Sequence, residues 1–344
     1  MRLLICTQVI DSKHPVLGFF VSWVRAFAAH AERIDVICLE QGAHDLPAHV
    51  QVHSLGKEAG AGKLRQLWRF YRYFGRALRA RPTHVFYHMG AIYNLLGAPF
   101  YLLRRGDTPQ FYWWKTHGHI DRKGRLAARF VDRIYTAVEE SFPIDSPKRH
   151  VIGHAIDTHR FTPGAAPRRA EILFTGRLTR SKHVEEVIDI VAQLRARGQA
   201  VTATIIGAPV DAAYAAELTE RVATEGLADV VTFIPGLAQP ELVSYYQRAR
   251  VFINPATNDG LDKVVLEAMA CGLIPLTCNR SFTRLLTPHG LYVERGDQVG
   301  YVARCEEILG LTSDEYAARV QPLTALVQSD HALATLPHRI FGVQ

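Results

Sequence analysis

The sequence from Val251 to Thr277, VFINPATNDGLDKVVLEAMACGLIPLT, contains the pattern that decides the fold. The apolar runs 251–254 and 274–277 are typical of buried strands, and the segment between them is typical of a polar loop followed by a helix. A helix between two buried strands returns the chain to the starting edge of the sheet, so the two strands are expected to run parallel. This stretch therefore predicts one unit of a parallel sheet covered by helices.

The same alternation extends outward over the whole chain. In the first half it predicts helices at 19–30, 63–80, 91–103 and 122–133, and strands at 2–9, 33–40, 50–55, 83–89, 110–115 and 134–138. In the second half it predicts strands at 172–175, 202–206, 230–234, 251–254, 274–277 and 291–294. We therefore expect an α/β protein with two doubly wound domains, 1–162 and 163–328, joined near a cluster of Pro and Gly at 157–169. Ligands of such sheets bind beyond the carboxyl ends of the strands, so the cleft between the domains is the expected site.

Length and composition agree with this organisation. The chain has 344 residues, of which 48% are hydrophobic and 21% charged, which excludes a mainly disordered protein. The five cysteines have no metal or redox spacing, so we expect buried thiols. No signal peptide is recognisable, and the longest apolar window, 89–103, is shorter than the roughly 20 residues that cross a bilayer. We expect a cytoplasmic protein.

The charge is concentrated in the first half. Residues 1–164 contain 23 Lys and Arg against 13 Asp and Glu, whereas residues 165–344 contain 17 against 20. In the segment 63–80, five arginines follow helical spacing, and Leu64, Leu67, Tyr71, Phe74 and Leu78 form the opposite stripe. The segment is either a surface helix with a solvated Arg face or an interfacial helix on anionic lipid at the inner face of the membrane, with Trp68, Phe70 and Tyr73 beside the arginines. No nucleic-acid-binding fold is recognisable, so we expect no nucleic-acid partner.

Several motifs that would indicate other chemistry are incomplete. The segment Gly60-Ala-Gly62-Lys63 lacks the first Gly and the Ser or Thr of a Walker loop. The chain has no Asp-x-Asp clamp for a metal diphosphate, and its histidines lack companions at metal-ligand spacing. We expect neither a metal nor another cofactor.

Two loops of the second half have the residues of a phosphate site. Gly176 to Lys182 joins a strand to a helix, and Arg177 and Lys182 can converge on a phosphate there. In the second loop, Asp259 precedes Glu267 by eight residues. Carboxylates there can accept hydrogen bonds from sugar and ribose hydroxyls, while loop N–H groups hold phosphate. An ion pair with a nearby Arg is the structural alternative for Glu267.

These segments together resemble the retaining glycosyltransferases of family 4. The resemblance is strongest in ILFTGRLTRSKHVEEVI, VVTFIPGLAQPELVSYYQRARVFINPA and DGLDKVVLEAMACGLIPLT, which lie in this order within 171–279. It implies the GT-B fold, in which two Rossmann-like domains face each other across a cleft and a C-terminal helix, about 329–344, crosses back to the first domain. It also implies a retaining, metal-independent transfer of a hexose from a UDP- or GDP-linked donor to a lipid-linked or polysaccharide acceptor.

The resemblance also implies roles for individual residues. Arg177 and Lys182, beside Gly176, would bind the donor diphosphate, Glu267 the ribose, and the backbone near Ile234 the base. Asp259 would lie at the donor sugar, and the amides of residues 260–263 would stabilise the leaving group. In the first domain, Gly18 resembles the glycine loop after strand one. His117, in WWKTHGHI, resembles the histidine at the reaction centre, with a structural histidine at a strand end as the alternative. The complete set of expected donor-loop residues is Asp259, Gly260, Leu261, Asp262, Lys263 and Glu267.

The chain departs from the family pattern in the donor loop. The family usually has Glu-Gly-Phe-Gly where this chain has Asp259-Gly260-Leu261-Asp262, and it usually has Gly where this chain has His183. Two alternatives therefore remain beside the transferase. One is a sugar-nucleotide-binding protein with weak or no transfer activity, and the other is an epimerase or hydrolase of sugar nucleotides on the same fold.

Overall fold

The computed structural model describes residues 1–14, 16–116, 118–257 and 260–343. The chain divides into two units. Unit 1 comprises Met1–Gly153 and Leu333–Gln344, and unit 2 comprises His154–Ala332. The expected boundaries 1–162 and 163–328 stay a prediction.

Unit 1 is built on a parallel sheet of seven strands in the order β3-β2-β1-β4-β5-β6-β7. The strands are β1 (Arg2–Ile10), β2 (Arg33–Gln41), β3 (Val50–Ser54), β4 (His84–His88), β5 (Gln110–Trp114), β6 (Arg133–Thr136) and β7 (Arg149–Val151). The central strands are almost continuously apolar because helices cover both faces of a parallel sheet. The order changes direction between β1 and β4, as in a doubly wound fold.

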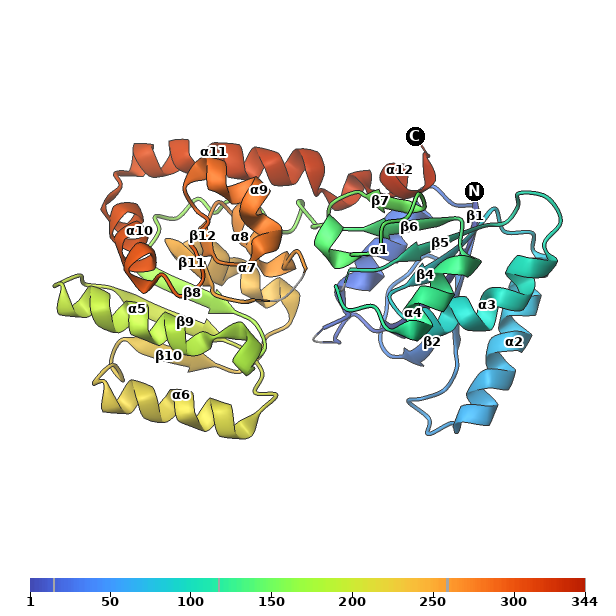
Figure 1. The fold of residues 1–344 in the computed structure, drawn as a ribbon, viewed down its shortest axis with the longest axis horizontal. Coiled ribbons are helices and arrows are strands. Elements are labelled where there is room, and N and C mark those ends of the chain that lie inside the picture. The colour runs from blue at the N-terminus through green and yellow to red at the C-terminus, as the bar shows by residue number, and fades with distance from the viewer. Residues whose placement is uncertain (15, 117, 258–259, 344) are drawn as a thin grey trace. The chain divides into compact units, whose positions relative to one another are not determined.

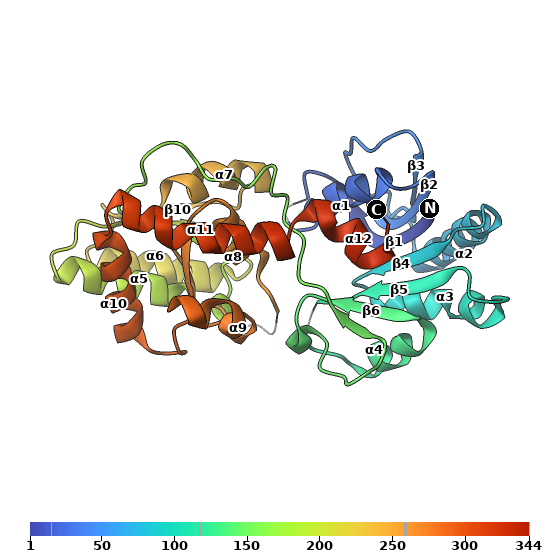
Figure 2. The same ribbon diagram turned by 90° about the horizontal axis from the view of Figure 1, so that it is seen from above.

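The helices of unit 1 pack on both faces of this sheet (Figure 2). The helices are α1 (Phe19–Ala28), α2 (Lys63–Arg79), α3 (Ala91–Leu103), α4 (Arg122–Ala127) and α12 (Leu336–Phe341), with short 3-10 turns at Ala128–Phe130, Glu139–Ser141 and Leu333–Thr335. The C-terminal α12 packs beside α1, where the ring of Phe341 lies 5.2 Å from that of Phe27. The end of the described chain thus completes the core of the unit in which the chain begins.

Unit 2 has a parallel sheet of five strands in the order β10-β9-β8-β11-β12. The strands are β8 (Glu171–Thr175), β9 (Thr202–Ile206), β10 (Val231–Ile234), β11 (Val251–Asn254) and β12 (Ile274–Thr277). The helices are α5 (Val184–Ala196), α6 (Ala212–Thr224), α7 (Gln239–Arg248), α8 (Lys263–Ala270), α9 (Thr283–Leu286), α10 (Gln298–Gly310) and α11 (Ser313–Asp330), with 3-10 turns at Arg180–Lys182, Arg280–Phe282 and Thr287–His289. Helix α10 packs with α5, and α11 packs with α8 (Figure 1). The order reverses between β8 and β11, so the loops that follow these two strands are neighbours.

The sequence predictions of secondary structure are largely confirmed. Eleven of the twelve predicted strands are present, with ends shifted by at most two residues. The predicted strand 291–294 is wrong, because only Tyr292 forms an isolated bridge, to Thr277. Strand β7 was not predicted, since it has three residues and carries Arg and His. The predicted helix 122–133 ends as a 3-10 turn at Phe130.

Helix α2 differs from its predicted orientation. Phe74 is buried as expected, but the other fully buried rings and methyls are those of Phe70 and Ala77. Leu64 is 85% exposed, and Leu67 and Tyr71 are also exposed, so the stripe opposite the arginines is not buried in the core as the surface-helix alternative requires. The reason is that the core beneath α2 accepts two aromatic rings of this helix: Phe74 stacks with Phe100 of α3, and Phe70 stacks with Tyr93, also of α3. The first half of α2 therefore presents both apolar and basic side chains to solvent.

Two further expectations concern membranes and thiols. None of the helices in the described part of the chain is long and apolar enough to span a bilayer. All five cysteines are buried thiols, as predicted.

Candidate functional site

The candidate site lies in unit 2 at the carboxyl ends of β8 and β11. The loop after β8 leads through the turn Arg180–Lys182 to α5, and the loop after β11 leads to α8. Both strands are buried along their length. The strand order reverses at this pair, and ligands of doubly wound sheets bind beyond the carboxyl ends of the strands at such a position.

The loop after β8 passes very close to the loop after β9. A Cβ atom on Gly207 would lie 2.0 Å from the carbonyl oxygen of Gly176, which only glycine permits. His183 ends this loop with a left-handed backbone (φ 48°), a conformation that glycine adopts at lower cost. Its Nε2 lies 3.3 Å from the Thr257 hydroxyl, a contact between the two loops.

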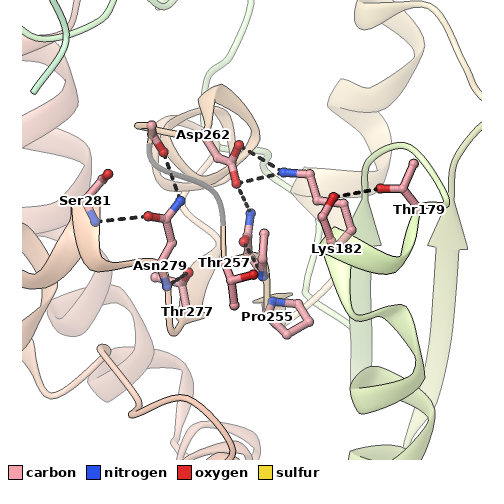
Figure 3. Close-up of polar contacts among 12 residues, drawn as sticks. Thr179, Lys182, Pro255, Thr257, Asp262, Thr277, Asn279 and Ser281 are labelled. Carbon is pink, nitrogen blue, oxygen red and sulfur yellow. Dashed lines mark hydrogen bonds and ion pairs between the residues drawn. The ribbon is translucent and has the colours of Figure 1, made fainter. Parts of the chain in front are cut away.

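The two loops meet in an ion pair between Lys182 and Asp262. The Lys182 ammonium donates to both carboxylate oxygens of Asp262, at 3.1 and 3.0 Å, and each side chain is 15% exposed (Figure 3). The amide of Asn254, at the end of β11, donates to the same carboxylate at 3.1 Å. Asp262 is thereby fixed at the start of α8.

A buried asparagine holds the described end of the donor loop. The amide of Asn279 donates to the carbonyl oxygen of Gly260 at 2.9 Å, and its own oxygen accepts from the backbone N–H of Ser281 (Figure 3). Asn279 is 1% exposed and lies two residues beyond the end of β12. The side chain of Leu261 is buried beside this contact. The hydrogen bond from Asn279 thus fixes the backbone at Gly260, just before α8 begins.

Glu267 lies one turn into α8 and is 3% exposed. Its carboxylate accepts hydrogen bonds from Gln239 of α7 at 2.6 Å and from the Tyr246 hydroxyl at 3.2 Å. Burial raises the pKa of Glu267, and the positive charge of Lys263, four residues earlier, opposes that shift. Burial also disfavours the charged form of Lys263, and it lowers the pKa of that side chain to about 7. Arg160 also lowers the pKa of Glu267, with a smaller effect than Lys263, and the predicted alternative of an ion pair with arginine stays open.

The remaining predicted residues occupy different parts of the chain. Arg177 is exposed and makes no hydrogen bond or ion pair with the described residues, so its guanidinium is available to a ligand. Ile234 ends β10, and its carbonyl oxygen accepts the N–H of Gly207. Gly18 lies in unit 1 at the start of α1, where a Cβ would be 2.7 Å from the carbonyl oxygen of His14. His117 and Asp259 lie outside the described residues.

The structure adds four polar residues that the sequence did not single out: Gln239, Tyr246, Asn254 and Asn279. Asn254 and Asn279 each follow an apolar strand at its carboxyl end, which is the signal that could have identified them. Gln239 and Tyr246 come from α7, and nothing in their spacing points to Glu267. Among the described residues, no group of three or more His, Cys, Asp or Glu side chains is arranged to hold a metal ion.

Comparisons with known proteins find sequence similarity mainly in unit 2. Residues 155–308 match the family model described as glycosyl transferases group 1. The chain is 31% identical over 171 residues to a D-inositol 3-phosphate glycosyltransferase of Jonesia denitrificans, an alignment that covers 44% of this chain and 40% of the relative. The chain therefore spans less than half the length of that relative.

Solved structures extend the likeness to both units. A HepE protein of Anabaena, crystallised with UDP and glucose, is 17% identical with a TM-score of 0.77, covering 99% of this chain and 98% of HepE. The sucrose-phosphate synthase of Thermosynechococcus elongatus is 16% identical with a TM-score of 0.75 and the same coverage. The chain has the GT-B fold of these glycosyltransferase structures, as predicted.

Proposed function

We propose that the protein is a retaining glycosyltransferase that moves a hexose from a UDP- or GDP-linked donor to a lipid-linked or glycan acceptor. The observation that carries the proposal is the ion pair between Lys182 and Asp262, which joins the loop after β8 to the start of α8 where the strand order reverses. The group 1 family match over 155–308 supports it. So does the likeness to HepE, whose crystal structure is a complex with UDP and glucose.

The chemistry follows from the charge of the leaving group. The bond between C1 of the hexose and the β-phosphate breaks, and negative charge grows on the departing diphosphate. Lys182, Arg177 and the backbone amides at the start of α8 provide positive potential for that charge without a metal ion. The acceptor hydroxyl forms the new bond to C1 on the same face, and its proton passes to the departing phosphate oxygen, so the configuration is retained.

The buried Glu267 fits a role in holding the nucleotide. Its carboxylate keeps acceptor capacity beyond the two bonds from Gln239 and Tyr246, so ribose hydroxyls can donate to it. The roles of Gly18 and Ile234 in donor binding, and of His117 and Asp259 at the reacting sugar, belong to the same proposal.

The acceptor side of the proposal involves unit 1 and a membrane surface. In the first half of α2, Leu64 and Trp68 are 85% and 60% exposed, and the Arg72 guanidinium lies 5.1 Å from the Trp68 ring. Exposed apolar side chains among arginines suit the interface of an anionic membrane. We therefore place the protein at the inner face of the cell membrane, where a lipid-linked acceptor is available.

A product assay tests the proposal. The protein is incubated with UDP- and GDP-hexoses in EDTA, with membrane lipid extract, inositol 3-phosphate or no acceptor, and the products are identified by NMR. We expect an acceptor-dependent glycoside of unchanged anomeric configuration. Free hexose without acceptor would indicate a hydrolase, an altered hexose an epimerase, and binding without turnover a sugar-nucleotide-binding protein; each would contradict the transferase.

A further inference from the structure

The Asp262 carboxylate lies at the centre of the candidate site, where hydrogen bonds fix its position. Lys182 contacts both of its oxygens, at 3.1 and 3.0 Å, and the amide of Asn254 donates to one of them at 3.1 Å (Figure 3). Asn254 is 2% exposed and lies at the end of β11, so its amide has a fixed direction. The carboxylate is therefore held from two sides by groups that also suit an anionic ligand.

A carboxylate and a phosphate present similar oxygens to an ammonium group. Both are anionic and accept short, charge-assisted hydrogen bonds from lysine. The Asp262 carboxylate thus takes up, in the free protein, the donors that a phosphate oxygen of the ligand would use. A diphosphate that approached Lys182 with the carboxylate in place would meet a like charge, which disfavours binding.

We propose that Asp262 determines the affinity of the site for nucleoside diphosphates, by competing with the ligand diphosphate for Lys182. This inference rests on the proposed function, since it assumes that a diphosphate binds at Lys182. The ligand displaces the carboxylate when it binds, and the ion pair between Asp262 and Lys182 forms again when it leaves. The same competition favours release of the nucleoside diphosphate after transfer.

Calorimetric titration with UDP and GDP tests the competition. Asp262→Asn keeps the shape of the side chain and removes its charge, so we expect it to bind the preferred diphosphate about tenfold more tightly than the wild type, or about 1.4 kcal/mol. Affinity for uridine or guanosine, which lack phosphate, should stay unchanged. Asp229→Asn is the matched control, because Asp229 is an exposed carboxylate of the same unit, and it should bind like the wild type.

The Lys182→Met background identifies the group for which Asp262 competes. There, Asp262→Asn should give a clearly smaller gain than in the wild type, because the contested ammonium is gone and only the repulsion between like charges is relieved. A gain of the same size without Lys182, or an Asp262→Asn variant that binds UDP and GDP no better than a wild type that binds them, overturns the inference and leaves the proposed function intact. If neither diphosphate binds to any of these proteins, the proposed function fails and the inference fails with it.

Discussion

Lys182 and Asp262 are 80 residues apart in sequence, and the reversal of strand order between β8 and β11 brings them into contact. The sequence indicated Lys182 through its spacing from Arg177 across a strand–helix turn. It also marked Asp262 as unusual. It could not indicate that the two form an ion pair, since that requires the course of both loops. Side-chain contacts of this kind follow from tertiary packing rather than from local pattern.

Glu267→Gln tests the residue that we expect to hold the ribose. The substitution keeps the volume but removes the charge that strengthens hydrogen bonds from hydroxyl donors. We expect kcat/KM for the donor to fall by about 10- to 100-fold, because a hydrogen bond to a charged group is worth about 1.5–3 kcal/mol. The measurement is steady-state kinetics with circular dichroism as a check on folding. Glu220→Gln, on the exposed face of α6, should leave kcat/KM unchanged; equal values for both variants would remove Glu267 from the site.

The environment of Asp35 in unit 1 predicts that the free energy of unfolding depends on pH. Burial raises the pKa of this carboxyl, but hydrogen bonds from His53 and Arg33 outweigh that effect and lower its pKa to about 2. A depressed pKa means that the folded protein binds this proton less readily than the unfolded chain does. The resulting stabilisation is complete above pH ~4 and is lost as the pH falls toward 2.

Asp35→Asn should therefore lower the free energy of unfolding by about 2 kcal/mol at pH 7 and by progressively less as the pH falls toward 2. Urea unfolding of the wild type and the variant between pH 2 and 7 measures the difference. Asp229→Asn, which removes an exposed carboxylate, should show almost no difference at any pH. A constant difference between wild type and Asp35→Asn across this range would contradict the argument.

At the scale of elements, the exposed surface of helix α2 predicts binding to anionic membranes. We expect the protein to co-sediment with anionic vesicles at low salt and to be released by high salt, which screens the arginines. Arg65→Gln with Arg72→Gln should weaken binding about 30-fold, at about 1 kcal/mol for each charge near the surface. Both side chains are exposed.

Two controls accompany the vesicle experiment. Neutral phosphatidylcholine vesicles should retain little protein, and Val210→Ser, which alters an exposed apolar residue of unit 2, should bind anionic vesicles like the wild type. Binding that does not depend on lipid charge, or that persists when both arginines are replaced, would indicate that the arginine face of α2 contacts only solvent.

The elements themselves followed largely from the pattern of apolar residues. Buried parallel strands such as 251–254 and 274–277 are short apolar runs, and their length and β-branched residues distinguish them from helices. The orientation of α2 was the main failure. The helix has apolar residues over much of its circumference, so the sequence offers two stripes, and only packing against Tyr93 and Phe100 of α3 selects Phe70 and Phe74 for the core.

At the scale of the whole molecule, the chain returns to unit 1 at its end, and the last described helix, α12, packs there. Leu336 and Ile340 of α12 are buried there, and the Tyr135 hydroxyl donates to the carbonyl oxygen of Ile340 at 2.7 Å. Ile340→Ala should lower the stability of unit 1 by about 2–5 kcal/mol through loss of buried methyl groups. Amide hydrogen exchange measures this unit by unit, with the exposed Leu103→Ala as control. Loss of protection confined to unit 2 would contradict this assignment of α12.

The proposed function requires that Lys182 and Arg177 bind the diphosphate of a nucleotide sugar without a metal ion. The most direct measurement is calorimetric titration of the wild type, Lys182→Ala and Arg177→Ala with UDP and GDP, in EDTA and again with magnesium. The account predicts that one diphosphate binds equally well in both buffers, and that each variant binds it at least about tenfold more weakly, since each loses a charge-assisted hydrogen bond. Binding that requires magnesium, or that is unchanged in both variants, would contradict it.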